Sequence, residues 1–466
     1  MSDDLAFLSA TDLVARYRAR RLSPVEATKA ALAAIEKHNP RLNAFRLVDP
    51  AFALAAARDS EARWMKGAPL GPVDGVPVSI KDLILAKGWP SLRGSRLIDP
   101  DQPWRDDAPG TARLRESGAV LLGKTNTSEF GWKGVTDSPL AGITRNPWNP
   151  ALTPGGSSGG AAAALASGMG ALALATDGGG SIRNPAHFTG LCGIKGTFGR
   201  VPAWPASPMG SLGNVGPMAR TMTDGALMMN VITQPDARDW LSLPPDGVNY
   251  LQGLEDGVAG WRVALCPDLG FAKLDPEVAA LLRNAADVFR RMGAQVEDAD
   301  PGIGNTTATF NTHWHVGVAA SFGALPPDKL ALLDPGLDDF VRLGLRISGV
   351  AFSQAQSERA AIGAKMRLFH ERYDLLLLPT AAVPAFPVER RDPPGVATDD
   401  WAAWTPFSYP FNLTMQPALS VPCGFTRAGL PVGLQIVGAM YTDARVLRAG
   451  RAFERELALP LRRPAL

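Results

Sequence analysis

The chain has 466 residues, of which 46% are hydrophobic and 20% charged, a balance typical of a globular protein with a sizeable core. Its formal net charge of +2 provides no field that would recruit nucleic acid or an anionic membrane. The three cysteines, Cys192, Cys266 and Cys423, are spaced for neither a metal site nor a disulfide framework, which favours the cytoplasm. We expect no signal peptide, and prolines and glycines break the uncharged stretch before Asp177 that could otherwise span a membrane.

Residues 1–70 are predicted to form an N-terminal helical segment. Ser9 precedes one helix, and Ser23 and Glu26 form a capping box with a proline at the first helical position of a second helix. An alanine-rich third helix is expected to begin after Asp49 and to run to about residue 66.

A short strand is predicted to end at Lys81. Val76, Val78 and Ile80 are apolar and alternate with Pro77 and Ser79, so Lys81 follows an apolar strand. A lysine buried beside apolar residues has a lowered pKa and can serve as a base. Lysine at a strand end is more often a surface residue, so the spacing alone leaves both interpretations open.

Helices and apolar strands alternate along the rest of the chain. Strands are predicted at residues 119–122, 171–176, 262–265, 375–378, 418–421 and 433–437, the last two as a hairpin. Helices are predicted at residues 108–118, 159–168, 181–188, 223–232 (capped by Thr223), 276–292, 350–372 and 443–456. Residues 302–345 lack a clear pattern and are expected to form a variable cap over a pocket. The alternation indicates an α/β layered fold with a largely buried sheet.

Two serines lie in glycine-rich segments, and these segments are the strongest chemical signal in the chain. Ser157 lies in residues 154–160, Pro-Gly-Gly-Ser-Ser-Gly-Gly, and Ser181 follows three glycines in residues 176–183. Glycine lets the backbone approach a ligand closely and turn its N–H groups inward. A serine beside such a loop can attack a carbonyl whose oxygen the N–H groups receive. Gly-Ser runs are also common in ordinary loops, so a second signal is needed.

Two literal motif matches have weaker support. Residues 118–125 fit the phosphate-loop pattern GxxxxGK[ST], but the four middle residues form the predicted strand instead of a loop. Residues 156–160 fit GxSxG with Ser158 as nucleophile, but no strand precedes them, whereas a histidine such as His187 does follow. We regard both as minor alternatives.

A metal site is also a minor alternative. His313 and His315 flank Trp314, but no third ligand is evident in the sequence, and histidines at alternate positions are typical of one face of a strand.

Several segments together resemble the amidase signature family. Residues 154–160 and 176–183 are similar to the two halves of that signature, and residues 75–82 to its lysine strand. Further similar segments are residues 123–130, 144–150, 190–201, 410–412 and 429–435. The resemblance covers nearly the whole chain and is weakest over residues 235–370. It implies a mixed sheet between layers of helices, with residues 71–466 as the catalytic domain and about 235–370 as its variable cap or substrate region, in one compact unit.

The resemblance also implies a mechanism. Ser181 would be the nucleophile, Ser157 a proton relay held after a cis peptide bond, and Lys81 the neutral base. The oxyanion hole would be formed by the backbone N–H groups of Gly178, Gly179, Gly180 and Ser181. Asp177 and Arg183 would be scaffold for this loop.

The remaining predicted site residues concern substrate binding. The acyl group of the substrate is expected to lie beside Phe130, Gly131, Trp132 and Ser158, together with residues 302–345. An equally supported alternative places Phe130 and Trp132 in the core. No cofactor, metal, nucleic-acid or membrane partner is implied, and a homodimer is left open.

The activity implied is hydrolysis of a small carboxylic amide, with an aryl or apolar acyl group, through an acyl-enzyme. The alternative is the glutaminase-type subunit of a tRNA-dependent amidotransferase. That subunit carries a tyrosine-rich segment, whereas residues 348–354 here contain no tyrosine, which favours a stand-alone amidase.

Overall fold

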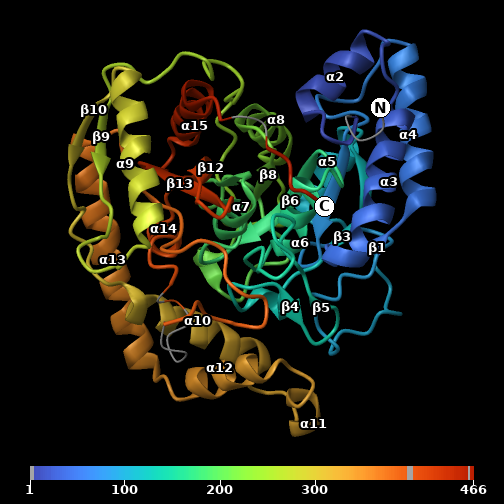
Figure 1. The fold of residues 1–466 in the computed structure, drawn as a ribbon. Helices are drawn as coiled ribbons and strands as arrows, with labels where there is room; N and C mark the ends of the chain where they lie inside the picture. The colour runs from blue at the N-terminus through green and yellow to red at the C-terminus, as the bar shows by residue number, and fades with distance from the viewer. Residues whose placement is uncertain (1–4, 396–401, 403, 460–461) are drawn as a thin grey trace.

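The computed structural model describes residues 5–395, 402, 404–459 and 462–466 (Figure 1). Within these residues, an eleven-stranded sheet runs through the centre of the molecule. Its strands, in spatial order, are β1 (Phe45–Val48), β3 (Val120–Thr125), β2 (Pro77–Lys81), β6 (Leu172–Asp177), β8 (Asn214–Ala219), β7 (Cys192–Lys195), β12 (Ala418–Phe425), β13 (Pro431–Gly438), β11 (Leu375–Pro379), β9 (Arg262–Leu265) and β10 (Gln295–Asp298). The sheet is mixed: β2 is parallel to β3 and β6, whereas β12 and β13 form the expected antiparallel hairpin.

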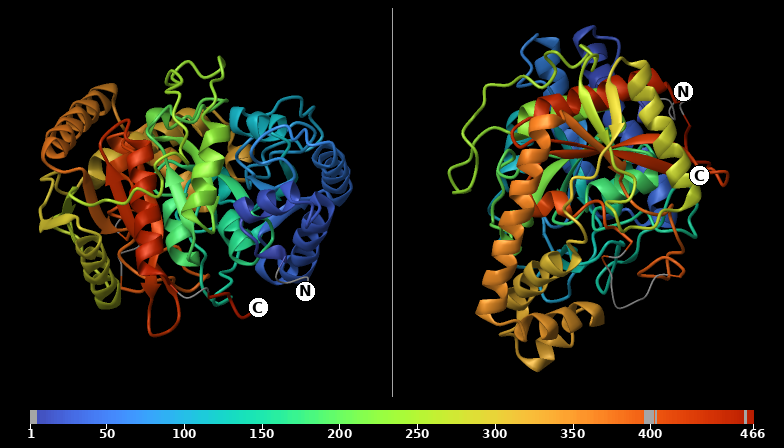
Figure 2. Two further views of the ribbon diagram at one scale, coloured as in Figure 1. Left: turned by 90° about the horizontal axis from the view of Figure 1, so that it is seen from above. Right: turned by 90° about the vertical axis from the view of Figure 1, so that its left-hand side faces the viewer.

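Helices cover both faces of the sheet (Figures 1 and 2). One layer contains α2 (Ala10–Arg18), α5 (Pro109–Glu116), α8 (Met222–Ile232), α9 (Pro276–Arg291) and α15 (Asp443–Leu457). The other contains α3 (Pro24–Leu42), α4 (Pro50–Met65), α6 (Gly159–Ala166), α7 (Arg183–Thr189) and α13 (Gly349–Arg372). The predicted α/β fold with a buried mixed sheet is confirmed.

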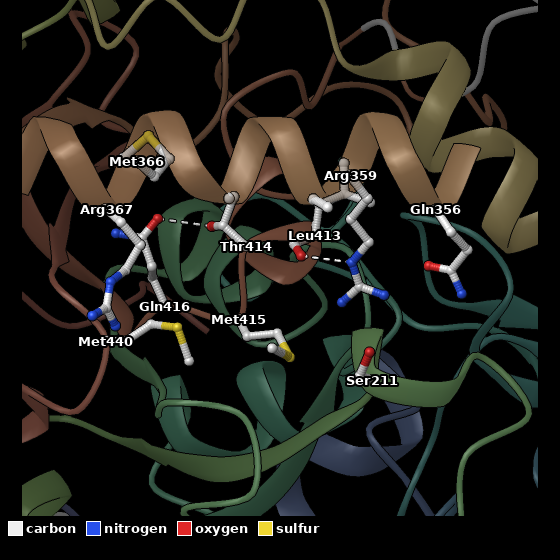
Figure 3. Close-up of a pocket in the computed structure, with 12 residues that line it drawn as sticks. Ser211, Gln356, Arg359, Met366, Arg367, Leu413, Thr414, Met415, Gln416 and Met440 are labelled. Carbon is white, nitrogen blue, oxygen red and sulfur yellow. Dashed lines mark hydrogen bonds between the residues drawn. The ribbon is translucent and has the colours of Figure 1, made fainter. Parts of the chain in front are cut away.

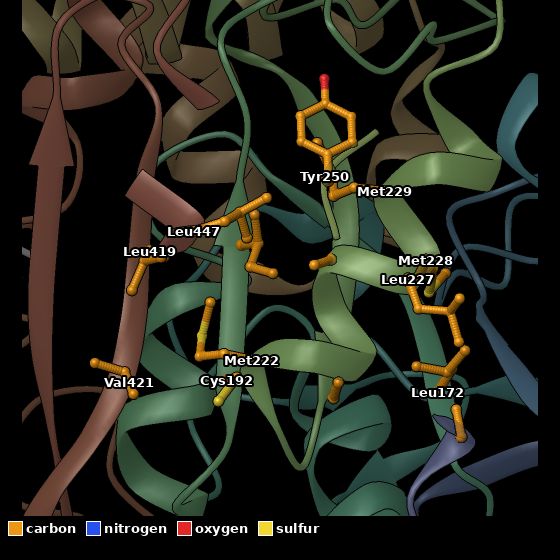
Figure 4. Packing of buried hydrophobic residues seen from close by; sticks show 14 of the residues in the cluster. Leu172, Cys192, Met222, Leu227, Met228, Met229, Tyr250, Leu419, Val421 and Leu447 are labelled. Atoms are coloured by element: carbon orange, nitrogen blue, oxygen red, sulfur yellow. The ribbon is translucent and has the colours of Figure 1, made fainter. Parts of the chain in front are cut away.

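Alternation along the strands explains why both faces are covered. In β6, Leu172 and Leu174 belong to the large cluster that includes α8 and α15, shown in part in Figure 4. Ala173 and Ala175 face the opposite way, into the cluster formed with α6 and α7. A strand that is apolar on both faces must be buried on both, which dictates two helical layers.

The described part of the N-terminal segment is mostly helical, and it contains one unpredicted strand. The Ser9 hydroxyl caps α2, and Ser23 with Glu26 forms the predicted capping box of α3. The unpredicted strand β1 pairs antiparallel with β3 at the sheet edge. Residues 1–70 therefore contribute to the central sheet. The cap of α8 is also corrected, because Thr221 and not Thr223 accepts the hydrogen bond from Asp224 N.

Residues 302–345, which showed no pattern, fold into helices. They form α10 (Thr307–Phe322), α11 (Pro327–Leu330) and α12 (Pro335–Leu345), which extend from the lower end of the molecule in Figure 1, beside the lower end of α13. We call α10–α12 the cap. Its buried side chains, among them Phe310, Trp314, Phe322 and Phe340, form a hydrophobic cluster that also includes Trp132, Leu212 and Tyr409. In the described part of the chain, no helix combines the length and apolar character needed to cross a membrane.

Candidate active site

The sheet brings the two chemical segments together. Strands β2 and β6 are adjacent and parallel, with Ile80 opposite Leu174. Their carboxyl ends therefore lie at the same edge of the sheet, a common place for ligand sites in α/β proteins. Lys81 ends β2, and Thr176 and Asp177 end β6.

Lys81 is fully buried and surrounded by hydroxyl groups. Its Nζ lies 2.7 Å from Ser157 Oγ, 2.8 Å from Ser158 Oγ and 2.8 Å from Thr176 Oγ1. Burial lowers the pKa of Lys81 well below its ordinary value, although the negative charge of Asp177 opposes this shift. The surroundings thus favour the neutral amine that a base requires.

Ser157 is held by the loop that precedes α6. The peptide bond between Gly156 and Ser157 is cis, as the family resemblance implied. Thr136 fixes the ends of this loop, since its hydroxyl donates to Gly155 O at 2.8 Å and accepts from Gly159 N at 2.9 Å. The Ser157 side chain is 1% exposed but lines a cavity that reaches Ser181.

Ser158 lies behind this cavity and not within it. Its hydroxyl accepts from Lys81 Nζ and donates to Thr176 O at 3.2 Å, and the side chain is completely buried. The structure therefore places Ser158 among the partners of Lys81, away from the substrate position predicted for it. Its backbone N donates to Ser181 O at 3.3 Å, which links the two serine segments.

Asp177 and Arg183 form a buried ion pair that fixes the glycine loop between them. Arg183 donates to both carboxylate oxygens of Asp177 at 2.9 Å, and both side chains are 0% exposed. Burial alone would raise the pKa of Asp177, but the Arg183 charge and hydrogen bonds hold it well below its usual range. The carboxylate also accepts from Gly180 N and Ile182 N at 2.7 and 3.2 Å. Their predicted scaffold role agrees with these contacts.

The three glycines differ in what their amides contact. The Gly180 amide is engaged with Asp177, so it is not free to receive a substrate oxygen in this conformation. Gly178 and Gly179 are partly exposed. Helix α10 lies directly against them: a Cβ on Gly178 would come within 2.9 Å of Trp314, and one on Gly179 within 2.8 Å of Phe310. Only glycine permits this close approach of the cap to the loop.

A cavity of about 350 Å³ opens beside Ser157 and Ser181. The predicted substrate residues Phe130, Gly131 and Trp132 line it, as does Gly178. A Cβ on Gly131 would lie 3.2 Å from Ser157 Oγ, so glycine keeps this side of the serine open. The cap and the loop before β8 supply further apolar lining residues, namely Trp204, Met209, Trp314, Val318, Phe322 and Leu337.

A second cavity, of about 290 Å³, lies between α13 and the segment after α14 (Pro410–Leu413) (Figure 3). It contains none of the candidate catalytic residues. In it, Arg359 donates to Leu413 O at 2.7 Å and Thr414 to Gln416 Oε1 at 2.8 Å.

The structure disfavours both alternative motifs, the phosphate loop at residues 118–125 and the GxSxG pattern at residues 156–160. Residues Val120–Thr125 are strand β3, so they do not form a phosphate loop, and Lys124 Nζ donates to Ser91 Oγ at 2.7 Å. His187, the candidate partner of Ser158, instead accepts from Gly433 N at 2.9 Å and contacts Val383 O.

The two histidines of the metal alternative also have other partners. They lie on α10, a helix, and not on the strand that their spacing suggested. His313 contacts Thr309 O and Gln356 Oε1 at 2.8 and 3.0 Å, whereas His315 packs against Phe340. Among the described residues, no group of three or more potential metal ligands occurs.

Several site residues were not singled out from the sequence. Thr176, which contacts Lys81, lies in a recognised segment but carries no distinctive local pattern. Ser408, Asn412 and Gln435 all contact Arg183, and Ser408 Oγ also donates to Gly179 O at 2.7 Å. The last three are more than 200 positions from Arg183 along the chain, so although Asn412 and Gln435 lie in segments that resemble the family, the sequence did not reveal their contact with Arg183.

Comparisons of the sequence and the fold with known proteins all point to one family. The model of the amidase family matches residues 26–447. The chain is 37% identical to a glutamyl-tRNA(Gln) amidotransferase subunit of Myxococcus xanthus, over 97% of this chain and 98% of that protein. It is 36% identical to an acylamidase of Rhodococcus erythropolis, over 97% and 96%. The structure superposes on a bacterial aryl acylamidase of the amidase signature family with a TM-score of 0.90 and 32% identity, over 97% and 96%. The chain therefore belongs to the amidase signature family and is an amidase, a hydrolase of amide C–N bonds.

Proposed function

We propose that the protein is a stand-alone amidase that cleaves a small amide with an aryl or apolar acyl group, using Ser181, Ser157 and Lys81. The observation that carries this proposal is the contact of a buried lysine with Ser157 at the mouth of a cavity that Ser181 also lines. Ser181 Oγ would attack the carbonyl carbon and form an acyl-enzyme, which water then hydrolyses.

The hydrogen bonds around Lys81 support a neutral amine as the base. A neutral amine has two N–H donors and one lone pair. The Ser158 hydroxyl donates to Thr176 O, so it must accept from Lys81. If Thr176 Oγ1 is the second acceptor, the lone pair is left for the hydroxyl hydrogen of Ser157. Ser157 can then pass a proton from Ser181 to Lys81 during attack and return it to the leaving nitrogen.

The negative oxygen formed during attack needs hydrogen-bond donors. The amides of Gly178 and Gly179 lie at the partly exposed part of the loop and are not engaged with Asp177. We assign the oxyanion hole to these two amides and that of Ser181, and leave Gly180 out. The Asp177–Arg183 pair holds the loop in place before substrate binds, which is the condition for effective electrostatic stabilisation.

The lining of the cavity supports an aryl or apolar acyl group. Its aromatic side chains come from three regions: Phe130 and Trp132 from the segment after β3, Trp204 from the loop before β8, and Trp314 and Phe322 from the cap. The rings of Phe130 and Phe322 are 4.6 Å apart and form one wall. The similarity to an acylamidase and an aryl acylamidase agrees with this substrate class.

The test is to replace Ser181 and Lys81 separately with alanine and to measure amide hydrolysis by the purified chain. Each variant should lose at least about 10⁴-fold in kcat, because the groups act as a unit. Ser167→Ala, a buried serine that bonds Ala163 O, and the exposed Lys87→Ala are matched controls that should retain activity. Retained hydrolysis in a folded Ser181→Ala or Lys81→Ala protein would refute the proposal.

A second candidate is the glutamine-hydrolysing component of a tRNA-dependent amidotransferase. The 37% identity to a protein of that kind favours it, whereas the tyrosine-free segment 348–354 does not. The two candidates differ in what the purified single chain can do. Turnover of acetanilide by the chain alone supports the amidase, whereas glutaminase activity that requires added partner proteins supports the second candidate.

A further inference from the structure

Arg93 is a charged residue that lines the substrate cavity, and the described residues provide no hydrogen-bond or ion-pair partner for its guanidinium. The cavity is lined by two charged residues of the described chain, Asp177 and Arg93. Asp177 is paired with Arg183. For Arg93, no hydrogen bond or ion pair of its guanidinium occurs among the described residues, and its Nε is buried without an acceptor.

Asp82, the acid that acts electrostatically on Arg93, already has other hydrogen-bond partners. Asp82 raises the pKa of Arg93, against the larger lowering that burial causes. However, both oxygens of Asp82 accept from Arg46, at 3.0 and 3.1 Å, and Gly94 N donates to the same carboxylate at 3.4 Å. Lys124 Nζ lies 4.0 Å from it as well. One carboxylate is thus shared among several basic groups, and it offsets only part of the cost of burying the Arg93 charge.

The backbone holds Arg93 in a fixed place next to the serines. The Arg93 carbonyl accepts from Phe130 N at 2.8 Å, and Phe130 precedes Gly131, which approaches Ser157. Arg93 has a φ of 55°, in the left-handed region that few non-glycine residues adopt. Arg93 therefore lines the cavity from an anchored segment.

An arginine in such a place has a clear chemical preference. Its guanidinium stays charged in proteins and has five donors that match a carboxylate in a bidentate arrangement. Leaving it buried and unpaired is unfavourable, and a substrate anion would remove that cost. The other lining groups are mostly aromatic or aliphatic, so they would hold the apolar part of the same molecule.

We infer that Arg93 is a specificity-determining residue and that the substrate is an amide with a carboxylate on either its acyl or its amine part. This inference rests on the proposed function, because it takes the cavity beside Ser157 and Ser181 as the substrate site. It adds an anionic group to the aryl or apolar amide proposed above.

The test uses two pairs of amides in which a nitro group replaces the carboxylate as a neutral isostere. The amine-side pair is para-acetamidobenzoate and para-nitroacetanilide; the acyl-side pair is succinic monoanilide and the anilide of nitropropionic acid. In the wild type, kcat/KM should favour the anionic member of at least one pair. Arg93→Leu should lower that preference about 10- to 100-fold, as expected for a lost charge-assisted hydrogen bond.

Two further variants separate recognition from a structural role. Arg93→Lys keeps the positive charge and should retain part of the preference, whereas the exposed neighbour Arg96→Leu should leave it unchanged. The pair that responds identifies which side of the amide bears the carboxylate. An equal preference in wild type and Arg93→Leu for both pairs would overturn the inference.

Binding measurements test the role of Arg93 independently of the proposed amidase activity. Calorimetric titration of the Ser181→Ala protein with each pair gives dissociation constants that do not depend on turnover. Tighter binding of an anionic member, lost in Ser181→Ala/Arg93→Leu, would support the role of Arg93 even if none of these amides is hydrolysed. Hydrolysis of the neutral amides by wild type, with equal binding of both members, would retain the amidase and reject the role of Arg93.

Discussion

The catalytic edge of the sheet and the cap are held together by different forces. At the edge, Lys81, Asp177 and Arg183 are fully buried, and each has several hydrogen-bond partners. In the cap, α10 and α12 pack through aromatic and aliphatic side chains such as Phe322 and Phe340. Hydrogen bonds are directional and costly to leave unmade, whereas apolar packing tolerates changes of shape that preserve volume.

This difference suggests a division of roles. The edge holds reacting groups at fixed distances, so a change there alters the chemistry of every substrate. The cap contributes one wall of the cavity, so a change there alters which substrate fits. The contact of α10 with Gly178 and Gly179 is the point where both regions meet. Four substitutions test the division, beginning with the one expected to have the largest effect.

Asp177→Asn should be the most damaging of these changes. It removes the charge that compensates Arg183, which is 0% exposed and would remain as an uncompensated buried cation. Breaking a buried pair in this way typically costs about 3–5 kcal/mol of unfolding free energy. Urea denaturation measures the loss, and hydrolysis of aryl and alkyl amides should fall together because the glycine loop is shared. A change of less than about 1 kcal/mol would show that Asp177 does not hold the loop.

Lys81→Met should change how stability depends on pH. The folded pKa of Lys81 is lowered by burial, so the unfolded chain binds its proton at a higher pH than the folded protein does. Stability should therefore rise with pH between the folded pKa and the ordinary value near 10.4, by up to about 1.4 kcal/mol per pH unit. Lys81→Met should lose this slope.

Burial also lowers the pKa values of Lys124 and Lys195, to about 7, but both lysines are present in both proteins. The difference between the two slopes of unfolding free energy against pH therefore reports on Lys81. Denaturation curves between pH 8 and pH 10 are the measurement. Equal slopes would mean that Lys81 is protonated in the folded state, which would remove it as the resting base.

The same contrast explains what the sequence could predict. Lys81, Ser157 and Ser181 lie in short segments where glycine, serine and an apolar strand give a strong local pattern, and the structure brings these segments together. The partners of Arg183 come from β13 and the region of α14, where only the folded chain reveals the contact. A local pattern cannot report such distant pairing.

A cap over the pocket was predicted for residues 302–345, but its helix α10 was missed for another reason. Helix α10 contacts α12, α13 and the glycine loop, so apolar residues lie around most of its circumference. A helix that is buried on several sides has no polar face, and the amphipathic period that identifies helices disappears. The strand β1 was missed because its four residues are too few for alternation to be distinctive.

Asp334→Ala should weaken the attachment of the cap without changing the chemistry. Asp334 accepts from Lys133 Nζ at 2.7 Å and from Gly336 N at 3.0 Å, at the start of α12. Loss of a helix cap and one ion pair costs about 1–2 kcal/mol. Hydrogen exchange should become faster in α12 and stay unchanged in β6. Uniform acceleration throughout the molecule would show that cap and core unfold as one unit.

Phe322→Leu should have the smallest effect and should be confined to substrate choice. Phe322 lines the cavity from α10, and its ring lies 4.6 Å from that of Phe130 in the core. Leucine fills similar space but cannot form the aromatic pair, which is worth about 0.5–1.5 kcal/mol beyond the area that it buries. We therefore expect the kcat/KM ratio of aryl to alkyl acyl amides to fall about 3- to 10-fold.

The matched control for Phe322→Leu is Phe289→Leu. Phe289 is buried on α9, in the helical layer that also contains α8 and α15, and its ring centroid lies 5.6 Å from that of Phe453. The control substitution should lower stability by a similar amount and leave the aryl-to-alkyl ratio unchanged. A ratio that falls equally in both variants would mean that general destabilisation changes the cavity. A fall restricted to Phe322→Leu would place acyl selectivity in the cap, since the serines and Lys81 would still treat both substrates alike.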